Sequence, residues 1–222
     1  MTSIGNDIVS LKSERSGRFA QKEYYSKILS PYEEALYHRI QSLPLSFKDY
    51  VWLLWTIKES VFKFYKRNNS ELLFHPQKIV VKNINEQKFI PDKNLAVEGF
   101  VLNEKLYLKG TADLNDNLHV FFSSILTEDF IFTITSSSEN SENLFSGIKQ
   151  IKNSDYSIQS SAVRNFIMNK LQSVFPLSFL EIKKNNEGIP VLIKDGRPSG
   201  LLISFSHHER WIAYSFENAS NK

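Results

Sequence analysis

The segment SFKDYVWLLWTIKESVFKFYKR, residues 46–67, carries the clearest structural pattern in the chain. Ser46 and Asp49 have the spacing of a helix start. Apolar residues then recur at helical intervals, at Val51, Leu54, Trp55, Phe62 and Tyr65. Polar residues fill the opposite side, at Thr56, Glu59, Ser60, Lys63 and Arg67. The segment therefore predicts a long amphipathic helix, with Glu59 and Lys63 on the same face one turn apart.

The composition is that of a globular protein with a sizeable core. The chain has 222 residues, of which 41% are hydrophobic, enough for one large or two small domains. It contains no cysteine, which excludes disulfides, thiolate chemistry and Cys-ligated zinc. The net charge of +3 mildly favours anionic ligands or acidic partners, but is below that of a dedicated nucleic-acid-binding protein. The sequence has no leader peptide and no apolar run long enough to cross a bilayer, so we expect a cytoplasmic protein with no membrane partner.

The order of the predicted elements occurs twice along the chain. Residues 3–11 predict a strand, residues 46–67 a helix, and several short strands follow between residues 78 and 136. A polar run at 136–143 predicts a linker, after which a strand, a helix over 160–175 and further strands repeat the order. This indicates a pseudo-two-fold duplication, with domains 1–138 and 139–222.

The two predicted domains differ in their polar residues. The first strand contains Asp7, for which Gln150 is the expected counterpart in the second domain, where no metal is expected. The second helix has no Lys-Glu-Ser triplet, and the first hairpin has no histidine where the second has His207 and His208. We therefore expect one site, built from the acids of the first domain and the histidine of the second.

Each of these residues also has an ordinary structural interpretation. Glu59 and Lys63 alone have the spacing of a solvated ion pair on a helix surface. Asp7 beside Gly5 is typical of a turn, and His207 on a hairpin is typical of a half-exposed surface residue. Their joint occurrence favours a functional site.

A set of motifs, taken in order, resembles a known family. They are GNDIV at 5–9, ILSPYEEA at 28–35, WTIKESVFK at 55–63, GIP at 188–190 and ISFSHH at 203–208. Together they are similar to the signatures of the 4′-phosphopantetheinyl transferase superfamily. The order, with aspartate first and histidine last, resembles the holo-acyl-carrier-protein synthase branch. The length and apparent duplication resemble the surfactin-type branch.

The resemblance implies an α+β fold in which each half is a small, mostly antiparallel sheet packed on a long helix. It implies transfer of 4′-phosphopantetheine from coenzyme A to a serine of an apo acyl carrier protein, or of a peptidyl or polyketide carrier domain. By the same resemblance, Asp7 and Glu59 hold Mg²⁺ and Glu59 accepts the serine proton. Lys63 contacts a phosphate, and Ser206 and His207 contact coenzyme A. A fused pseudo-dimer would act as a monomer.

The sequence departs from the family pattern at two positions. The second acid of the surfactin-type branch is replaced by Val9, as in the synthase branch. The lysine of the usual Gly-Lys-Pro is replaced by Ile189, which leaves Lys194 or Arg197 as candidate substitutes for the missing cation.

The partner and two other functional classes stay open at this point. Arg15, Arg18 and Lys22 are candidates for contacting an acidic helix of the carrier protein, with solvated surface charges as the alternative. A non-catalytic relative that only binds coenzyme A or a carrier protein would keep the same hairpin and helix. A nucleic-acid-binding protein is disfavoured, because the lysines are dispersed and no base-stacking motif is present.

Overall fold

The computed structural model describes residues 3–13, 21–90, 94–115, 117–139 and 143–217 and has an α+β fold. The helices are α1 (Lys22–Tyr25), α2 (Pro31–Arg39), α3 (Phe47–Lys66), the 3-10 turn η2 (Pro76–Lys78) and α4 (Tyr156–Val174). The strands are β1 (Ile4–Ser10), β2 (Ile79–Gln87), β3 (Leu95–Glu98), β4 (Leu106–Leu114), β5 (Leu118–Leu126), β6 (Phe130–Ser136), β7 (Leu144–Gln150), β8 (Leu180–Lys184), β9 (Pro190–Lys194), β10 (Arg197–Pro198), β11 (Leu202–His208) and β12 (Trp211–Glu217). Part of the expected linker, residues 140–142, lies outside the described residues.

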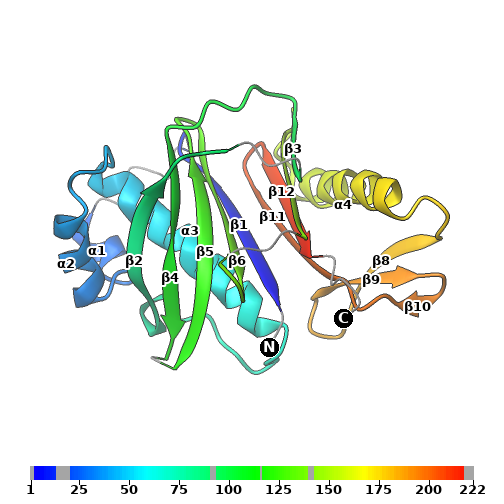
Figure 1. Cartoon of the computed structure of the whole chain (residues 1–222), viewed down its shortest axis with the longest axis horizontal. Coiled ribbons are helices and arrows are strands. Elements are labelled where there is room, and N and C mark those ends of the chain that lie inside the picture. Colours follow the sequence, from blue (N-terminus) through cyan, green and yellow to red (C-terminus); the bar gives the residue numbers. More distant parts are fainter. Residues whose placement is uncertain (1–2, 14–20, 91–93, 116, 140–142, 218–222) are drawn as a thin grey trace.

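The strands form three sheets, which are mostly antiparallel (Figure 1). The first has the order β1-β6-β5-β4-β2 and is antiparallel throughout. The second has the order β11-β12-β7-β3, in which β3 is parallel to β7. The third is the small sheet β10-β9-β8. The early part of the chain therefore contributes a strand, β3, to a sheet otherwise formed by its later part.

The helix start predicted at Ser46 is confirmed, and a second capped helix start lies within the ILSPYEEA motif. Ser30 and Glu33 form a reciprocal capping box at the start of α2, with Pro31 in its first turn. The Ser46 side chain accepts a hydrogen bond from the backbone N–H of Asp49 at the start of α3.

The polar side of α3 is partly buried. Thr56 and Ser60 are fully buried, and their hydroxyls donate to the carbonyls of Trp52 and Ile57 within the helix, at 2.7 Å each. Such back-bonding satisfies a hydroxyl without a solvent partner. The predicted amphipathic helix is thus present, and part of its polar side packs inside the protein. Glu59, Lys63 and Arg67 remain half-buried.

Strand β1 lies unusually close to α3. A Cβ placed on Gly5 would lie 1.9 Å from the carbonyl oxygen of Ser60, so any larger residue would push the strand off the helix. Asp7 shares the helix-facing side of β1 with Gly5, because alternate residues of a strand point the same way. The glycine thus sets how near Asp7 comes to α3.

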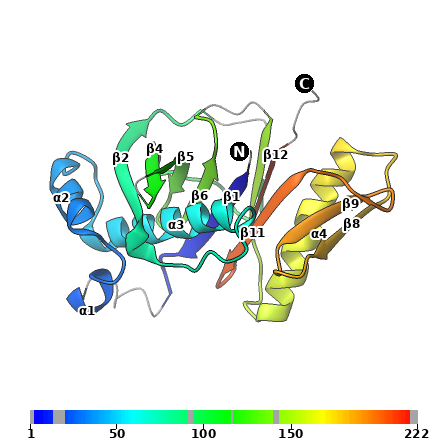
Figure 2. The ribbon, with the colours of Figure 1, turned by 90° about the horizontal axis from the view of Figure 1, so that it is seen from below.

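Strand β1 also lies beside β11, so that the edges of the first two sheets meet (Figures 1 and 2). The contact uses side chains of β11. The N–H of Asn6 donates to Ser204 Oγ at 3.1 Å, and the N–H of Ser10 donates to His208 Nδ1 at 2.9 Å. This seam brings residues near the two ends of the chain into one place.

Gln150 is not the positional counterpart of Asp7. On β7, a Cβ on Gly147 would lie 2.9 Å from the Phe166 ring of α4, and the Lys149 ammonium lies over the same ring. Gly147 and Lys149 therefore occupy the helix-facing side, which is the side that Asp7 occupies on β1. Gln150 points to the opposite face, so the expected pairing of Asp7 with Gln150 was wrong.

Among the described residues, none of the helices combines the length and the apolar composition that crossing a membrane would require.

Candidate active site

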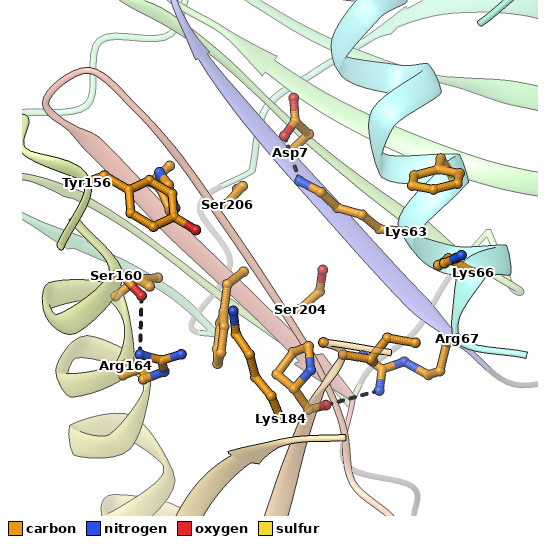
Figure 3. Close-up of a pocket in the computed structure, with 17 residues that line it drawn as sticks. Asp7, Lys63, Lys66, Arg67, Tyr156, Ser160, Arg164, Lys184, Ser204 and Ser206 are labelled. Carbon is orange, nitrogen blue, oxygen red and sulfur yellow. Dashed lines mark hydrogen bonds and ion pairs between the residues drawn. The ribbon is translucent and has the colours of Figure 1, made fainter. Parts of the chain in front are cut away.

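A cleft of about 430 Å³ opens between α3 and the later part of the chain. Side chains from β1 and α3 form one wall, and side chains from α4, β11 and residues 184–190 form the other (Figure 3). Its charged lining consists of Asp7, Lys63, Lys66, Arg67, Arg164 and Lys184. Cations thus outnumber acids around the cleft, which favours a ligand carrying several negative charges.

Asp7 and Lys63 meet across the contact between β1 and α3. Lys63 Nζ lies 2.7 Å from Asp7 Oδ1 and also donates to the carbonyl of Asn6 at 3.0 Å. Asp7 is only 8% exposed. Burial raises the pKa of Asp7 above its ordinary value, while the charge and hydrogen bond of Lys63 act in the opposite direction.

Glu59 lies one turn before Lys63 on α3 and is half-buried. Burial, followed by the charge of Asp7, raises the pKa of Glu59 to about 7, against the opposing effect of Lys63. The carboxylates of Asp7 and Glu59 are therefore close enough to repel each other. Glu59 is not among the side chains that line the cleft.

The pair of carboxylates fits a divalent cation that is completed by other ligands. Mg²⁺ commonly uses one or two carboxylates together with water and substrate phosphate oxygens. Two mutually repelling carboxylates supply hard oxygen donors and lose their repulsion when a cation binds. No group of three or more metal-ligating side chains occurs in the part of the chain that the structure describes. A cation here would therefore draw ligands from Asp7, Glu59 and the bound substrate.

Ser206 and His207 lie on the opposite wall, on β11. Ser206 Oγ is buried and has no hydrogen-bond partner among the described residues. His207 is half-buried, with its ring 5.3 Å from that of Tyr156 on α4. Burial lowers the pKa of His207, and the neighbouring cation Lys63 acts in the same direction. His207 thus lines the same cleft as the Asp7–Lys63 pair.

His208 belongs to different surroundings. Its Nδ1 accepts from the N–H of Ser10, and its ring lies 6.1 Å from that of Trp52. It lines a separate cavity of about 850 Å³ together with Gln159 and Arg210. Neighbouring histidines in the sequence therefore face two different cavities.

Part of the cationic lining of the cleft was not predicted from the sequence. Lys184 pairs with Pro190 across the β8–β9 hairpin, which brings it beside the Gly188–Ile189–Pro190 segment. Arg164 lies on α4, where it donates to Ser160 Oγ at 3.1 Å. Neither position has a motif around it. Lys184 is brought to the cleft by the register of the β8–β9 hairpin, and Arg164 by the approach of α4 to the cleft.

The cations proposed to replace the missing lysine lie elsewhere. The ammonium of Lys194 stands over the Phe175 ring at 4.7 Å, and Arg197 is exposed on β10. Neither lines the cleft. Two cations that do line the cleft lie next to this segment: Lys184 pairs with Pro190, and Arg67 donates to the carbonyl of Pro190.

The expected carrier-contacting residues are only partly visible. Lys22 is exposed on α1, whereas Arg15 and Arg18 lie outside the described residues.

A comparison with protein families matches residues 3–135, more than half of the 222-residue chain, to the 4′-phosphopantetheinyl transferase superfamily. The chain belongs to this superfamily. The resemblance stated from the sequence motifs is thereby confirmed, and the protein is a transferase of the phosphopantetheinyl transferase type. Neither the curated proteins nor the solved structures gave a match to this member of the superfamily.

The matched region contains Asp7, Glu59 and Lys63 and ends before the later wall of the cleft. Members of the 4′-phosphopantetheinyl transferase superfamily use coenzyme A as substrate and typically a divalent metal, and they act on carrier proteins. The placement of Ser206, His207, Arg164 and Lys184 in this phosphopantetheinyl transferase comes from the fold and not from the family match.

Proposed function

We propose that the protein transfers 4′-phosphopantetheine from coenzyme A to a serine hydroxyl of an apo acyl carrier protein or peptidyl carrier domain, releasing adenosine 3′,5′-bisphosphate. The observation that carries this proposal is the cleft itself. It places the acid and lysine of the family motif, Asp7 and Lys63, opposite Ser206 and His207 within a cationic lining. Coenzyme A carries a diphosphate and a further phosphate, which suits such a lining.

The acids are assigned to the metal and to the proton. Asp7 and Glu59 would hold Mg²⁺, whose role when bound is to neutralise the diphosphate as the serine oxygen attacks phosphorus. Glu59 is also assigned to accept the serine proton, directly or through a water. Lys63 would leave Asp7 for a phosphate oxygen of the substrate, where it stabilises developing charge.

Coenzyme A is assigned to both walls. His207 and the unpartnered hydroxyl of Ser206 would donate to its phosphates from β11. Arg164 and Lys184 add positive charge on the same wall. The acid and lysine lie on one wall, and Ser206 and His207 lie on the other. Because a coenzyme A molecule would need both walls, we expect one coenzyme A per chain, bound by a monomer.

The repeated arrangement of elements supports a duplication, with domains 1–138 and 139–222. The first sheet contains β1-β6-β5 beside α3, and the second contains β7-β12-β11 beside α4, each with the same antiparallel neighbours. In each case a strand, a long helix and a closing hairpin follow in the same chain order. The composite cleft would then be the site that survived of two ancestral ones.

Intact-mass measurement of apo carrier proteins, incubated with coenzyme A, Mg²⁺ and the enzyme, tests this function. We expect the carrier mass to increase by one phosphopantetheine group, and the increase to be absent with EDTA or with a carrier whose acceptor serine is alanine. Coenzyme A binding without a mass increase on any of a panel of acyl and peptidyl carriers would instead identify a non-catalytic binding relative. If the protein neither binds coenzyme A nor increases the mass of any carrier, the proposal is refuted.

A further inference from the structure

Arg67, at the C-terminal cap of α3, forms hydrogen bonds far from its own helix. Its Nη1 donates to the carbonyl of Pro190 at 3.2 Å, and its Nη2 donates to the carbonyl of Ile203. These acceptors are 123 and 136 residues away in sequence. Figure 3 shows the Arg67 side chain extending from the end of α3, with a dashed line marking its hydrogen bond to the opposite wall.

Both acceptors belong to the wall that faces α3. Pro190 lines the cleft and begins β9 directly after the Gly188–Ile189 segment. Ile203 precedes Ser204 on β11, the strand that carries Ser206 and His207. One guanidinium therefore joins the helix bearing Lys63 to two separate strands of the opposite wall.

We propose that Arg67 is a positioning residue that clamps the two walls of the cleft at a fixed separation. On the proposed function, on which this catalytic consequence rests, a ligand held by Lys63 then reaches Ser206 and His207 at the same time. Arg67 acts through the two carbonyls and not as a ligand of the substrate phosphates.

The bonding of Arg67 favours a clamp over a free cation. A planar guanidinium presents its donors in a rigid fork on separate nitrogens, and two of these nitrogens reach the two strands here, whereas a lysine carries all its donors on one nitrogen. Arg67 Nε is buried without a partner, and no carboxylate among the described residues forms an ion pair with the side chain. The buried charge is thus held by carbonyl dipoles, and burial lowers the pKa of Arg67.

Lys66 provides a matched control. It is the preceding residue and also lines the cleft, but its ammonium donates to the carbonyls of Ser70 and Leu72, which follow it in the chain. Replacing Lys66 removes a cation from the same end of the cleft without removing a contact between the walls.

The clamp is tested first without any ligand. Hydrogen-exchange mass spectrometry of Arg67→Lys, Arg67→Met, Lys66→Met and the unmodified protein compares peptides covering 188–194 and 202–208. Loss of hydrogen bonds from a charged donor predicts exchange faster by roughly tenfold in both Arg67 variants. Lys66→Met should match the unmodified protein. Unchanged exchange in Arg67→Lys would overturn the clamp, and that variant decides the question if Arg67→Met does not fold.

Coenzyme A titration and carrier transfer give the second readout. Both Arg67 variants should raise the Kd for coenzyme A about tenfold and also lower kcat, because a lost clamp misplaces both walls. Lys66→Met should raise KM with kcat retained. If Arg67→Lys keeps the affinity and kcat of the unmodified protein while Arg67→Met does not, Arg67 serves as a charge and the clamp is refuted. An unmodified protein that neither binds coenzyme A nor modifies a carrier would refute the proposed function, while the exchange comparison would still decide whether Arg67 holds the walls.

Discussion

Lys63 Nζ forms a 2.7 Å ion pair with Asp7 Oδ1, so that the lysine of the helix motif neutralises the aspartate of the first strand before any ligand binds. The pair lies on the cleft wall formed by β1 and α3, with Glu59 one turn away. A substrate phosphate and a metal ion together would replace both partners of this pair. The arrangement thus couples metal and phosphate binding in the proposed reaction.

Replacing either acid should remove activity and leave the fold intact. In Asp7→Asn and Glu59→Gln we expect the transfer rate to fall by at least about 100-fold, because each loses a donor to the metal that neutralises the transition state. The measurement is carrier modification followed by intact mass, with thermal unfolding as the check on folding. Asp113→Asn is the control, since Asp113 also forms ion pairs, with Lys82 and His119, but does not line the cleft. Turnover like that of the unmodified protein in either acid variant would exclude the metal site.

Stability without metal should depend on pH through Glu59. Its pKa rises from 4.5 to about 7 on folding, so the folded state binds the proton more tightly than the unfolded state. The stability from this group is fully present below pH 4.5 and is lost as pH rises through about 7. At 1.36 kcal/mol per pKa unit, the loss is at most roughly 3 kcal/mol. Urea unfolding in EDTA at several pH values should therefore show a decline that is smaller in Glu59→Gln. The exposed Glu34→Gln should retain the full decline, and an equal decline in Glu59→Gln would contradict the assignment.

The adjacent histidines should have separable effects. His207→Ala should weaken coenzyme A binding by about fivefold to tenfold with a smaller effect on kcat, because it removes one hydrogen bond to the ligand. His208→Ala should instead lower the free energy of unfolding, since His208 holds the N–H of Ser10. Calorimetric titration and urea unfolding measure the two effects. A larger loss of affinity in His208→Ala would mean that the hairpin is aligned one residue away from the motif.

The buried ion pair between Glu33 of α2 and Lys58 of α3 should contribute to stability. Lys58 Nζ contacts Glu33 Oε2 at 2.7 Å and donates to the carbonyls of Ile28 and Pro76, with both charged side chains fully buried. Lys58→Met leaves the Glu33 carboxylate buried without its partner and should cost about 3–5 kcal/mol. Urea unfolding should show that Lys58→Met/Glu33→Gln recovers part of this loss. If the free energy of unfolding of Lys58→Met lies within about 1 kcal/mol of that of the unmodified protein, the ion pair is dispensable for stability.

The sequence predicted those parts of the site that depend on local backbone geometry. Glu59 and Lys63 share a helix face because they are four residues apart, and Ser46 caps α3 because the spacing lets its hydroxyl accept from the N–H of Asp49. The motif order likewise indicated the family, which the match over residues 3–135 confirms. Such features need few long-range contacts, so they can be predicted from residues that are close together in the sequence.

The tertiary structure alone decided which side chains meet. Gly5 admits β1 so close to Ser60 that Asp7 reaches Lys63, and a hairpin register brings Lys184 beside Pro190. Thr56 and Ser60, on the polar side of α3, are buried, which their hydroxyls tolerate because they donate to carbonyls of their own helix. The seam between β1 and β11 joins residues 198 apart. Contacts over such separations depend on how whole elements pack together, and no local pattern of residues specifies that packing.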